Sequence, residues 1–84
     1  MKPASILIVE DEKLIRDTLR RRLTRDDHRV QEADRGDRAL DLVSNNAFEV
    51  VLLDYRLPDT DGLAVLRKIK SLYPDMVVII MTAF

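Results

Sequence analysis

The chain has 84 residues, of which 46% are hydrophobic and 35% are charged, and its formal net charge at pH 7 is −1. This length predicts one small globular domain, and the near balance of charge argues against binding to nucleic acid or to an anionic membrane. The sequence contains no cysteine, no apolar run that could span a bilayer and no signal peptide ahead of its first apolar run, so we expect a cytosolic protein without disulfides.

Short apolar runs alternate along the chain with stretches in which apolar residues recur at helical spacing. The predicted elements are, in chain order, a strand at Ser5–Val9, a helix from Glu12 or Lys13 to Thr24, a strand at Arg29–Ala33, a helix at Asp37–Ser44, a strand at Glu49–Leu53, a helix from Asp61 or Gly62 to just before Pro74, and a strand at Met76–Met81. Strands that alternate with helices in this way indicate an α/β domain with a parallel sheet and right-handed crossovers.

The first predicted helix carries a cluster of basic residues, at Arg16, Arg20, Arg21, Arg22 and Arg25. Such a cluster could contact phosphate groups. Nearby aspartates balance its charge, however, and a solvated helix face is the commoner origin of this pattern. We therefore interpret these arginines as the solvent-exposed side of the helix.

The stretch from Val50 to Gly62 organises the predicted fold. Its four apolar residues, Val50–Leu53, indicate a short central strand that is buried on both faces. The run ends at Asp54, and Pro58 and Gly62 then mark a turn into the next helix. In open α/β sheets ligands bind at this end of the strands, but an aspartate that follows a strand is as often a turn residue or a helix cap. Taken alone, Asp54 favours neither interpretation.

A second acidic segment, Glu10–Glu12, follows the strand at Ser5–Val9. If the two strands are parallel neighbours, their ends lie roughly 5 Å apart, and Glu10 and Asp11 come close to Asp54. Carboxylates that close repel one another unless one is protonated or a cation binds, and carboxylates with water form the usual shell of Mg²⁺. These acids could instead complement the N-terminus of the following helix. A single acid would suffice to complement the helix N-terminus, so the adjacent acids together with Asp54 favour a cation site.

Two common nucleotide-binding motifs are missing from the sequence. No G-x-G-x-x-G follows the first predicted strand, and G-x-x-x-x-G-K-[ST] does not occur. Dinucleotide-binding and P-loop functions are therefore poor interpretations of this α/β pattern.

Three segments carry a resemblance to a known family, and they are Ile6-Leu7-Ile8-Val9-Glu10-Asp11-Glu12, Val51-Leu52-Leu53-Asp54-Tyr55-Arg56-Leu57-Pro58-Asp59-Thr60-Asp61-Gly62 and Val78-Ile79-Ile80-Met81-Thr82-Ala83. In this order and spacing they resemble the CheY-like receiver domain of two-component response regulators, over the whole chain. The resemblance implies a flavodoxin-like fold with sheet order 2-1-3-4-5 in a complete domain. The ending Met81–Phe84 is similar to that of NtrC-type regulators, which control σ54-dependent transcription.

The resemblance implies a role for each matching residue. Asp54 corresponds to the phosphoryl acceptor, which takes its group from a sensor histidine kinase and forms an aspartyl phosphate. Glu10 and Asp11 correspond to the acidic pair that holds Mg²⁺ together with Asp54 and the backbone carbonyl of Arg56. Glu10 stands where the family commonly has aspartate, and its extra methylene suggests binding through water. Thr82 corresponds to the switch hydroxyl that hydrogen-bonds the phosphoryl group.

The resemblance also implies that residues 1–84 are a receiver domain without its fourth helix, fifth strand and fifth helix, so that the sheet order is 2-1-3-4. The family's strand-five lysine, which pairs with the phosphoryl oxygens, and its strand-five aromatic residue are then missing, and we expect weaker phosphorylation. No output domain is included. The strand at Met76–Met81 becomes an exposed apolar edge, through which we expect self-association or pairing with a fused partner.

Three functions remain open from the sequence. The first is a phosphorylatable signalling module that assists its own phosphorylation but is not otherwise an enzyme, and that controls an output such as transcription. The second is a haloacid-dehalogenase-like phosphatase, which also uses an aspartate after a parallel strand but requires a second aspartate where this chain has Arg56. The third is a fragment that folds only by oligomerisation or fusion and has lost phosphorylation. We favour the first.

Overall fold

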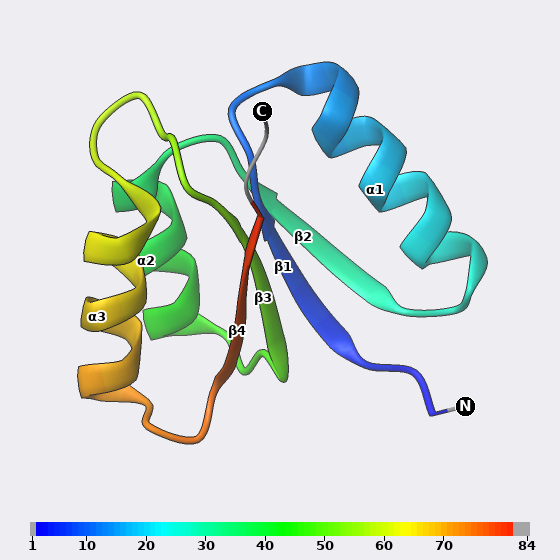
Figure 1. The fold of residues 1–84 in the computed structure, drawn as a ribbon. Coiled ribbons are helices and arrows are strands. Elements are labelled where there is room, and N and C mark those ends of the chain that lie inside the picture. The colour runs from blue at the N-terminus through cyan, green and yellow to red at the C-terminus, as the bar shows by residue number, and fades with distance from the viewer. Residues whose placement is uncertain (1, 82–84) are drawn as a thin grey trace.

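The computed structural model describes residues 2–81, which form four strands and three helices in alternation. The elements are β1 (Ser5–Val9), α1 (Lys13–Arg25), β2 (Arg29–Ala33), α2 (Gly36–Asn45), β3 (Val50–Asp54), α3 (Gly62–Leu72) and β4 (Val77–Met81). All pairings between neighbouring strands are parallel, in the order β2-β1-β3-β4 (Figure 1). This confirms the predicted flavodoxin-like α/β fold with order 2-1-3-4. None of the helices in residues 2–81 is long and apolar enough to cross a membrane.

The predicted and observed element boundaries differ by at most one residue. The difference that matters is at β3, which includes Asp54 as its last residue instead of ending before it. Asp54 pairs with Met81 on β4, and the backbone N–H of Tyr55 donates to the Met81 carbonyl at 3.0 Å. Because the hydrogen-bonded ladder continues past the apolar run, the backbone of Asp54 is held by the sheet and not by a loop.

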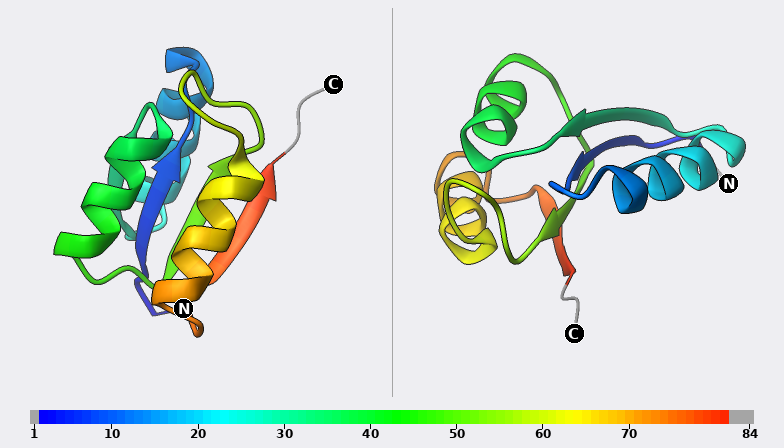
Figure 2. Two further views of the ribbon diagram at one scale, coloured as in Figure 1. Left: turned by 90° about the vertical axis from the view of Figure 1, so that its left-hand side faces the viewer. Right: turned by 90° about the horizontal axis from the view of Figure 1, so that it is seen from above.

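The main hydrophobic core lies between the sheet and the pair α2 and α3. Figure 2 shows these two helices on one face of the sheet and α1 on the other. Alternate residues along a strand point to opposite faces, and those of β1 and β3 on this side reach the core. Its buried members are Leu7, Val9, Ala33, Ala39, Val43, Phe48, Val51, Leu53, Val65 and Ile69.

The opposite face of the sheet is covered only in part. Helix α1 packs on β1 and β2, and Figure 2 shows it away from β4. Val51 and Leu53 of β3 are fully buried toward α2 and α3, but Val50 and Leu52 are only half-buried. The prediction that this strand is buried on both faces is therefore wrong for the α1 side, because that helix does not extend over β3.

Helix α2 is capped by a residue from a distant part of the chain. The carboxylate of Asp59, in the β3–α3 loop, accepts hydrogen bonds from the backbone N–H groups of Gly36, at 2.7 Å, and Asp37, at 2.9 Å. These two hydrogen bonds lower the pKa of Asp59. The helix's own N-cap residue, Arg35, makes no side-chain cap. Asp59 therefore supplies the acceptors that the start of α2 would otherwise lack, and it ties the β3–α3 loop to α2.

Gly62 brings the end of β3 against the start of α3. A Cβ atom at this position would lie 2.5 Å from the Asp54 carbonyl oxygen and 2.9 Å from Tyr55 Cα. The Gly62 N–H donates to the Tyr55 carbonyl at 2.6 Å, and Asp61 caps α3 by accepting from the Ala64 N–H at 2.8 Å. Gly62 therefore permits a tight entry into α3, at the turn that the sequence predicts.

We predict that Asp59→Ala lowers the free energy of unfolding by about 1 kcal/mol, because two N–H groups at the start of α2 lose their acceptor. Equilibrium unfolding in urea measures this loss. The matched control is Asp75→Ala, which removes an exposed carboxylate from the α3–β4 loop and is expected to change the free energy by less than about 0.5 kcal/mol. Equal losses in the two variants would show that Asp59 does not act as the cap of α2.

Candidate metal centre at the carboxyl edge of the sheet

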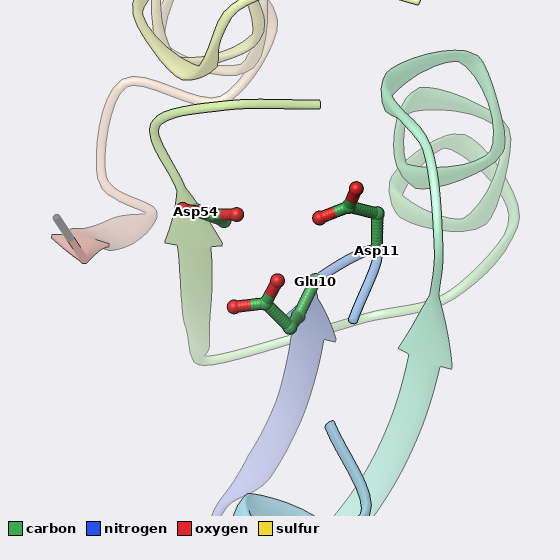
Figure 3. Close-up of side chains that lie close together, drawn as sticks. All are labelled: Glu10, Asp11 and Asp54. Carbon is green, nitrogen blue, oxygen red and sulfur yellow. The ribbon is translucent and has the colours of Figure 1, made fainter. Parts of the chain in front are cut away.

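Three carboxylates converge where β1 and β3 end. The register pairs Val9 with Leu53, so the residues that follow them, Glu10 and Asp54, lie side by side. One oxygen from each of Glu10, Asp11 and Asp54 lies within 4.8 Å of the other two (Figure 3). The structure thus brings together the three acids that the sequence places at this edge.

The three side chains are held to different degrees. Glu10 is 4% exposed, its backbone N–H donates to the Ala33 carbonyl at 3.0 Å, and its Oε2 accepts from the Glu12 N–H at 3.2 Å. Asp54 is half-buried at the end of a central strand. Asp11 is exposed, so its position depends on the conformation of the β1–α1 loop. The site therefore combines two acids fixed by the sheet with one fixed by a loop.

Burial raises the pKa of Glu10 from its ordinary value of 4.5 to about 7. The nearby carboxyl groups of Asp54 and Asp11 contribute to this rise, and the hydrogen bond from the Glu12 N–H opposes it. A buried carboxylate beside two others is costly to ionise unless a positive charge compensates it. Near neutral pH, a proton and a metal cation therefore compete for this site.

The donor set fits a hard divalent cation such as Mg²⁺. All of its side-chain donors are carboxylate oxygens, and Mg²⁺ prefers oxygen ligands at about 2.1 Å with several waters retained. Oxygens on opposite sides of one such ion lie roughly 4 Å apart. The observed spread of up to 4.8 Å needs only a small movement of the side chains to meet this geometry.

The family resemblance assigns two further residues to the site, and the structure does not test their roles. Arg56 lies in the exposed loop two residues after Asp54 and forms an isolated bridge with Asp61. The role of its backbone carbonyl as a ligand stays a prediction. Thr82 lies outside the described residues, 2–81, so its role as the switch hydroxyl also stays a prediction.

Sequence reasoning missed the contact between Arg16 and the acidic loop. Arg16 Nη1 donates to the Glu10 carbonyl at 2.9 Å, and its side chain is 18% exposed. The interpretation as a solvated face holds for Arg21, Arg22 and Arg25, which are exposed, but is wrong for Arg16. The sequence contained one indication of this contact. Arg16 lies one helical turn beyond the acidic loop, and long side chains in a helix point back toward its N-terminus.

Comparison with known proteins gives a consistent result. The family model of the response regulator receiver domain matches residues 6–84. Response regulator MprA from Mycobacterium sp. (strain KMS) is 40% identical over 81 residues, which are 96% of this chain and 35% of MprA. The chain thus spans about a third of the length of the curated relatives that it matches.

Solved structures of similar proteins have the same fold. A CheY-like response regulator receiver domain protein from Methanospirillum hungatei JF-1 superposes with a TM-score of 0.94 and 31% identity, covering 99% of this chain and 66% of that one. The response regulator TrrA from Thermotoga maritima, in complex with Mg²⁺-BeF, superposes with a TM-score of 0.92 and 31% identity, covering 96% of this chain and 70% of that one.

The raised pKa of Glu10 predicts a pH-dependent contribution to stability. Between pH 4.5 and about 7 the folded chain keeps the Glu10 proton that the unfolded chain has released. The free energy of unfolding should therefore fall as pH rises through this interval, by about 1 to 3 kcal/mol, and then level off. The control is Glu10→Gln, which cannot ionise and removes this part of the pH dependence.

The measurement is urea unfolding of both chains across this pH interval without divalent cations. The difference between parent and variant isolates Glu10 from the other acids, which titrate in both chains. Added Mg²⁺ is expected to stabilise the parent more than the variant, most strongly above pH 7. Parallel pH profiles for the two chains would contradict the raised pKa.

Proposed function

The chain belongs to the response regulator receiver family, whose members accept phosphoryl groups, and we propose that Asp54 accepts one from a sensor histidine kinase, with Mg²⁺ held at Glu10 and Asp11. The observation that carries this proposal is the convergence of these three carboxylates at the end of two central strands. A site with this donor set and an aspartate at its centre suits Mg²⁺-assisted phosphoryl transfer.

The transfer step needs a carboxylate nucleophile that is held in place. An oxygen of Asp54 attacks the phosphorus of a phosphohistidine, a P–O bond forms, the P–N bond breaks, and the bonding pair of that P–N bond stays on the departing imidazole nitrogen. Bound Mg²⁺ would neutralise charge on the phosphoryl oxygens. Pairing with Met81 fixes the backbone of Asp54, so only its side chain has to orient.

The other residues of the site prepare it for the donor. Glu10 and Asp11 supply negative charge that attracts the cation, and Glu10 must release its proton before it binds as a carboxylate. We assign the backbone carbonyl of Arg56 as a further ligand and the hydroxyl of Thr82 as a hydrogen-bond donor to the phosphoryl group. These two assignments rest on the family motif alone.

Phosphorylation would act as a conformational switch. A phosphoryl group at Asp54 adds negative charge at the sheet edge and favours whichever conformer contacts it better, which shifts the population of the chain. We propose that this shift controls an output such as transcription. Because the chain matches about a third of each curated relative, the output would lie in a domain outside this sequence.

The exposed side of β4 supports a proposal about partners, namely self-association of the 84-residue chain. In residues 2–81, β4 lies at one edge of the sheet, and its Val77 and Ile79 are 52% and 49% exposed. An apolar edge strand with unpaired backbone groups favours pairing with another strand. A second copy of the chain would offer the same edge and the same apolar side chains.

We predict that incubation with acetyl phosphate and Mg²⁺ adds a single phosphoryl group to the parent chain, detected by intact-mass spectrometry. The adduct should be absent from Asp54→Ala, which lacks the nucleophile, and from the parent in excess EDTA. Asp75→Ala, which removes an exposed acid at the opposite end of the sheet, should be modified like the parent. A parent chain that is folded by circular dichroism but takes no phosphoryl group would contradict the proposal and favour a scaffold without chemistry.

For self-association, we predict that the apparent mass of the parent by light scattering rises with protein concentration. Replacing Val77 and Ile79 together with lysine should keep the chain monomeric, because charge on an edge strand opposes pairing. The matched control replaces Leu72, which is 52% exposed on α3, with lysine. A parent that stays a monodisperse monomer at all concentrations and melts cooperatively would rule out pairing through β4.

A further inference from the structure

The β1–α1 loop is held by a side chain that does not belong to the acidic cluster. Arg16 lies in the first turns of α1, and its Nη1 donates to the carbonyl oxygens of Glu10, at 2.9 Å, and Asp11, at 3.4 Å. These are the main-chain oxygens of the two acids whose side chains meet Asp54. One guanidinium group therefore contacts both of the loop residues that set the geometry of the site.

Glu32 on β2 holds this guanidinium from the other side. Glu32 pairs with Ile8 in the sheet, so its backbone position is fixed next to β1. Its Oε1 is buried, has no hydrogen bond within the described residues, and lies 4.0 Å from Arg16 Nε and 3.7 Å from Arg20 Nε. A buried carboxylate oxygen without a hydrogen bond is costly, and the two nearby cations compensate its charge. Glu32 thus draws Arg16 toward β2.

The orientation of Arg16 leaves the acidic cluster unpaired. An arginine that contacts the main chain of Glu10 and Asp11 would ordinarily be expected to pair with their carboxylates, often in a bidentate way. Within residues 2–81 its side chain instead donates to carbonyls and pairs only with Glu32, and no ion pair joins it to Glu10, Asp11 or Asp54. The carboxylate oxygens of the cluster therefore stay available to a metal cation while the loop that carries them is restrained.

We propose that Arg16 is a positioning residue for the cation site, oriented by Glu32, and that it keeps the Asp11 carboxylate converged with those of Glu10 and Asp54. The inference rests on the proposed function, because it concerns the Mg²⁺ that the acidic cluster would bind. Residues that orient metal ligands in this indirect way typically change metal affinity about 10- to 100-fold when they are removed. Asp11 should depend on Arg16 most, since its side chain is exposed and only its backbone holds it.

The sign of the effect separates positioning from simple electrostatics. Arg16 is a positive charge close to the site, so its removal would strengthen cation binding if charge alone mattered. If Arg16 instead organises the loop, its removal weakens cation binding, because Asp11 must then be ordered when the metal binds. The two accounts therefore predict opposite shifts in the dissociation constant for Mg²⁺.

The experiment measures the Mg²⁺ dissociation constant of the 84-residue chain and four variants by NMR titration of backbone amides. Arg16→Met should weaken binding about tenfold or more. Arg16→Lys, which keeps the charge and one donor, should restore part of the affinity, and Glu32→Gln should weaken binding less than Arg16→Met. The matched control is Arg20→Met, which removes the same charge from the same Glu32 pair without touching the loop, and which should stay within about twofold of the parent.

Amide hydrogen exchange without metal gives a second readout, which does not depend on activity. Exchange at residues 11 and 12 should be faster in Arg16→Met than in the parent and unchanged in Arg20→Met. Equal or tighter Mg²⁺ binding by Arg16→Met, with unchanged exchange, would overturn the proposal while leaving the proposed function intact. If Arg16→Met does not fold, the Mg²⁺ dissociation constants and amide exchange rates of Arg16→Lys and Glu32→Gln, compared with the parent, decide whether the proposal holds. A parent chain that binds no Mg²⁺ at the acidic cluster would instead overturn the proposed function and this inference with it.

Discussion

Mutual repulsion among three carboxylates is the constraint on which the carboxyl edge of this sheet depends. The parallel register of β1 and β3 forces Glu10 and Asp54 to be neighbours, and the β1–α1 loop adds Asp11. Burial of Glu10 adds to the cost of ionising it, and burial together with the neighbouring carboxyl groups raises the pKa of Glu10 to about 7. The fold tolerates this local cost because the strands beneath are tightly packed, with Val9 and Leu53 fully buried. A site that is unfavourable without a cation is one that binds a cation readily.

Contacts outside the acidic cluster hold its surroundings in place. Gly62 lets α3 begin against the end of β3, so that Asp54 is followed by a short, fixed loop. Asp59 ties that loop to α2. On the opposite side, Arg16 contacts the loop that carries Asp11. The β1–α1 and β3–α3 loops are thus each attached to a helix, which limits how far the carboxylates can separate.

Apolar runs and helical spacing were sufficient to predict a parallel α/β sheet, and they predicted the convergence of Glu10, Asp11 and Asp54 on the condition that the first and third strands are neighbours. The strand order that meets this condition came from the resemblance to the receiver family. The cap that Asp59 gives to α2 was not predictable, since it joins residues 23 apart in sequence through a loop of irregular conformation. The contacts of Arg16 depend on how α1 sits over β1, which periodicity does not specify. The half-burial of Leu52 was missed for the same reason.

The most direct test of a divalent-cation site at this edge is paramagnetic broadening of backbone amide signals by Mn²⁺, which favours the same oxygen ligands as Mg²⁺. At a small fraction of one equivalent, Mn²⁺ should broaden the amide signals of Glu10, Asp11 and Asp54 first, and excess Mg²⁺ should restore them. Broadening that is equally strong at exposed acids far from this edge, such as Asp26 and Asp75, would contradict the account, because the three converged carboxylates would then bind cations no better than an ordinary acidic surface.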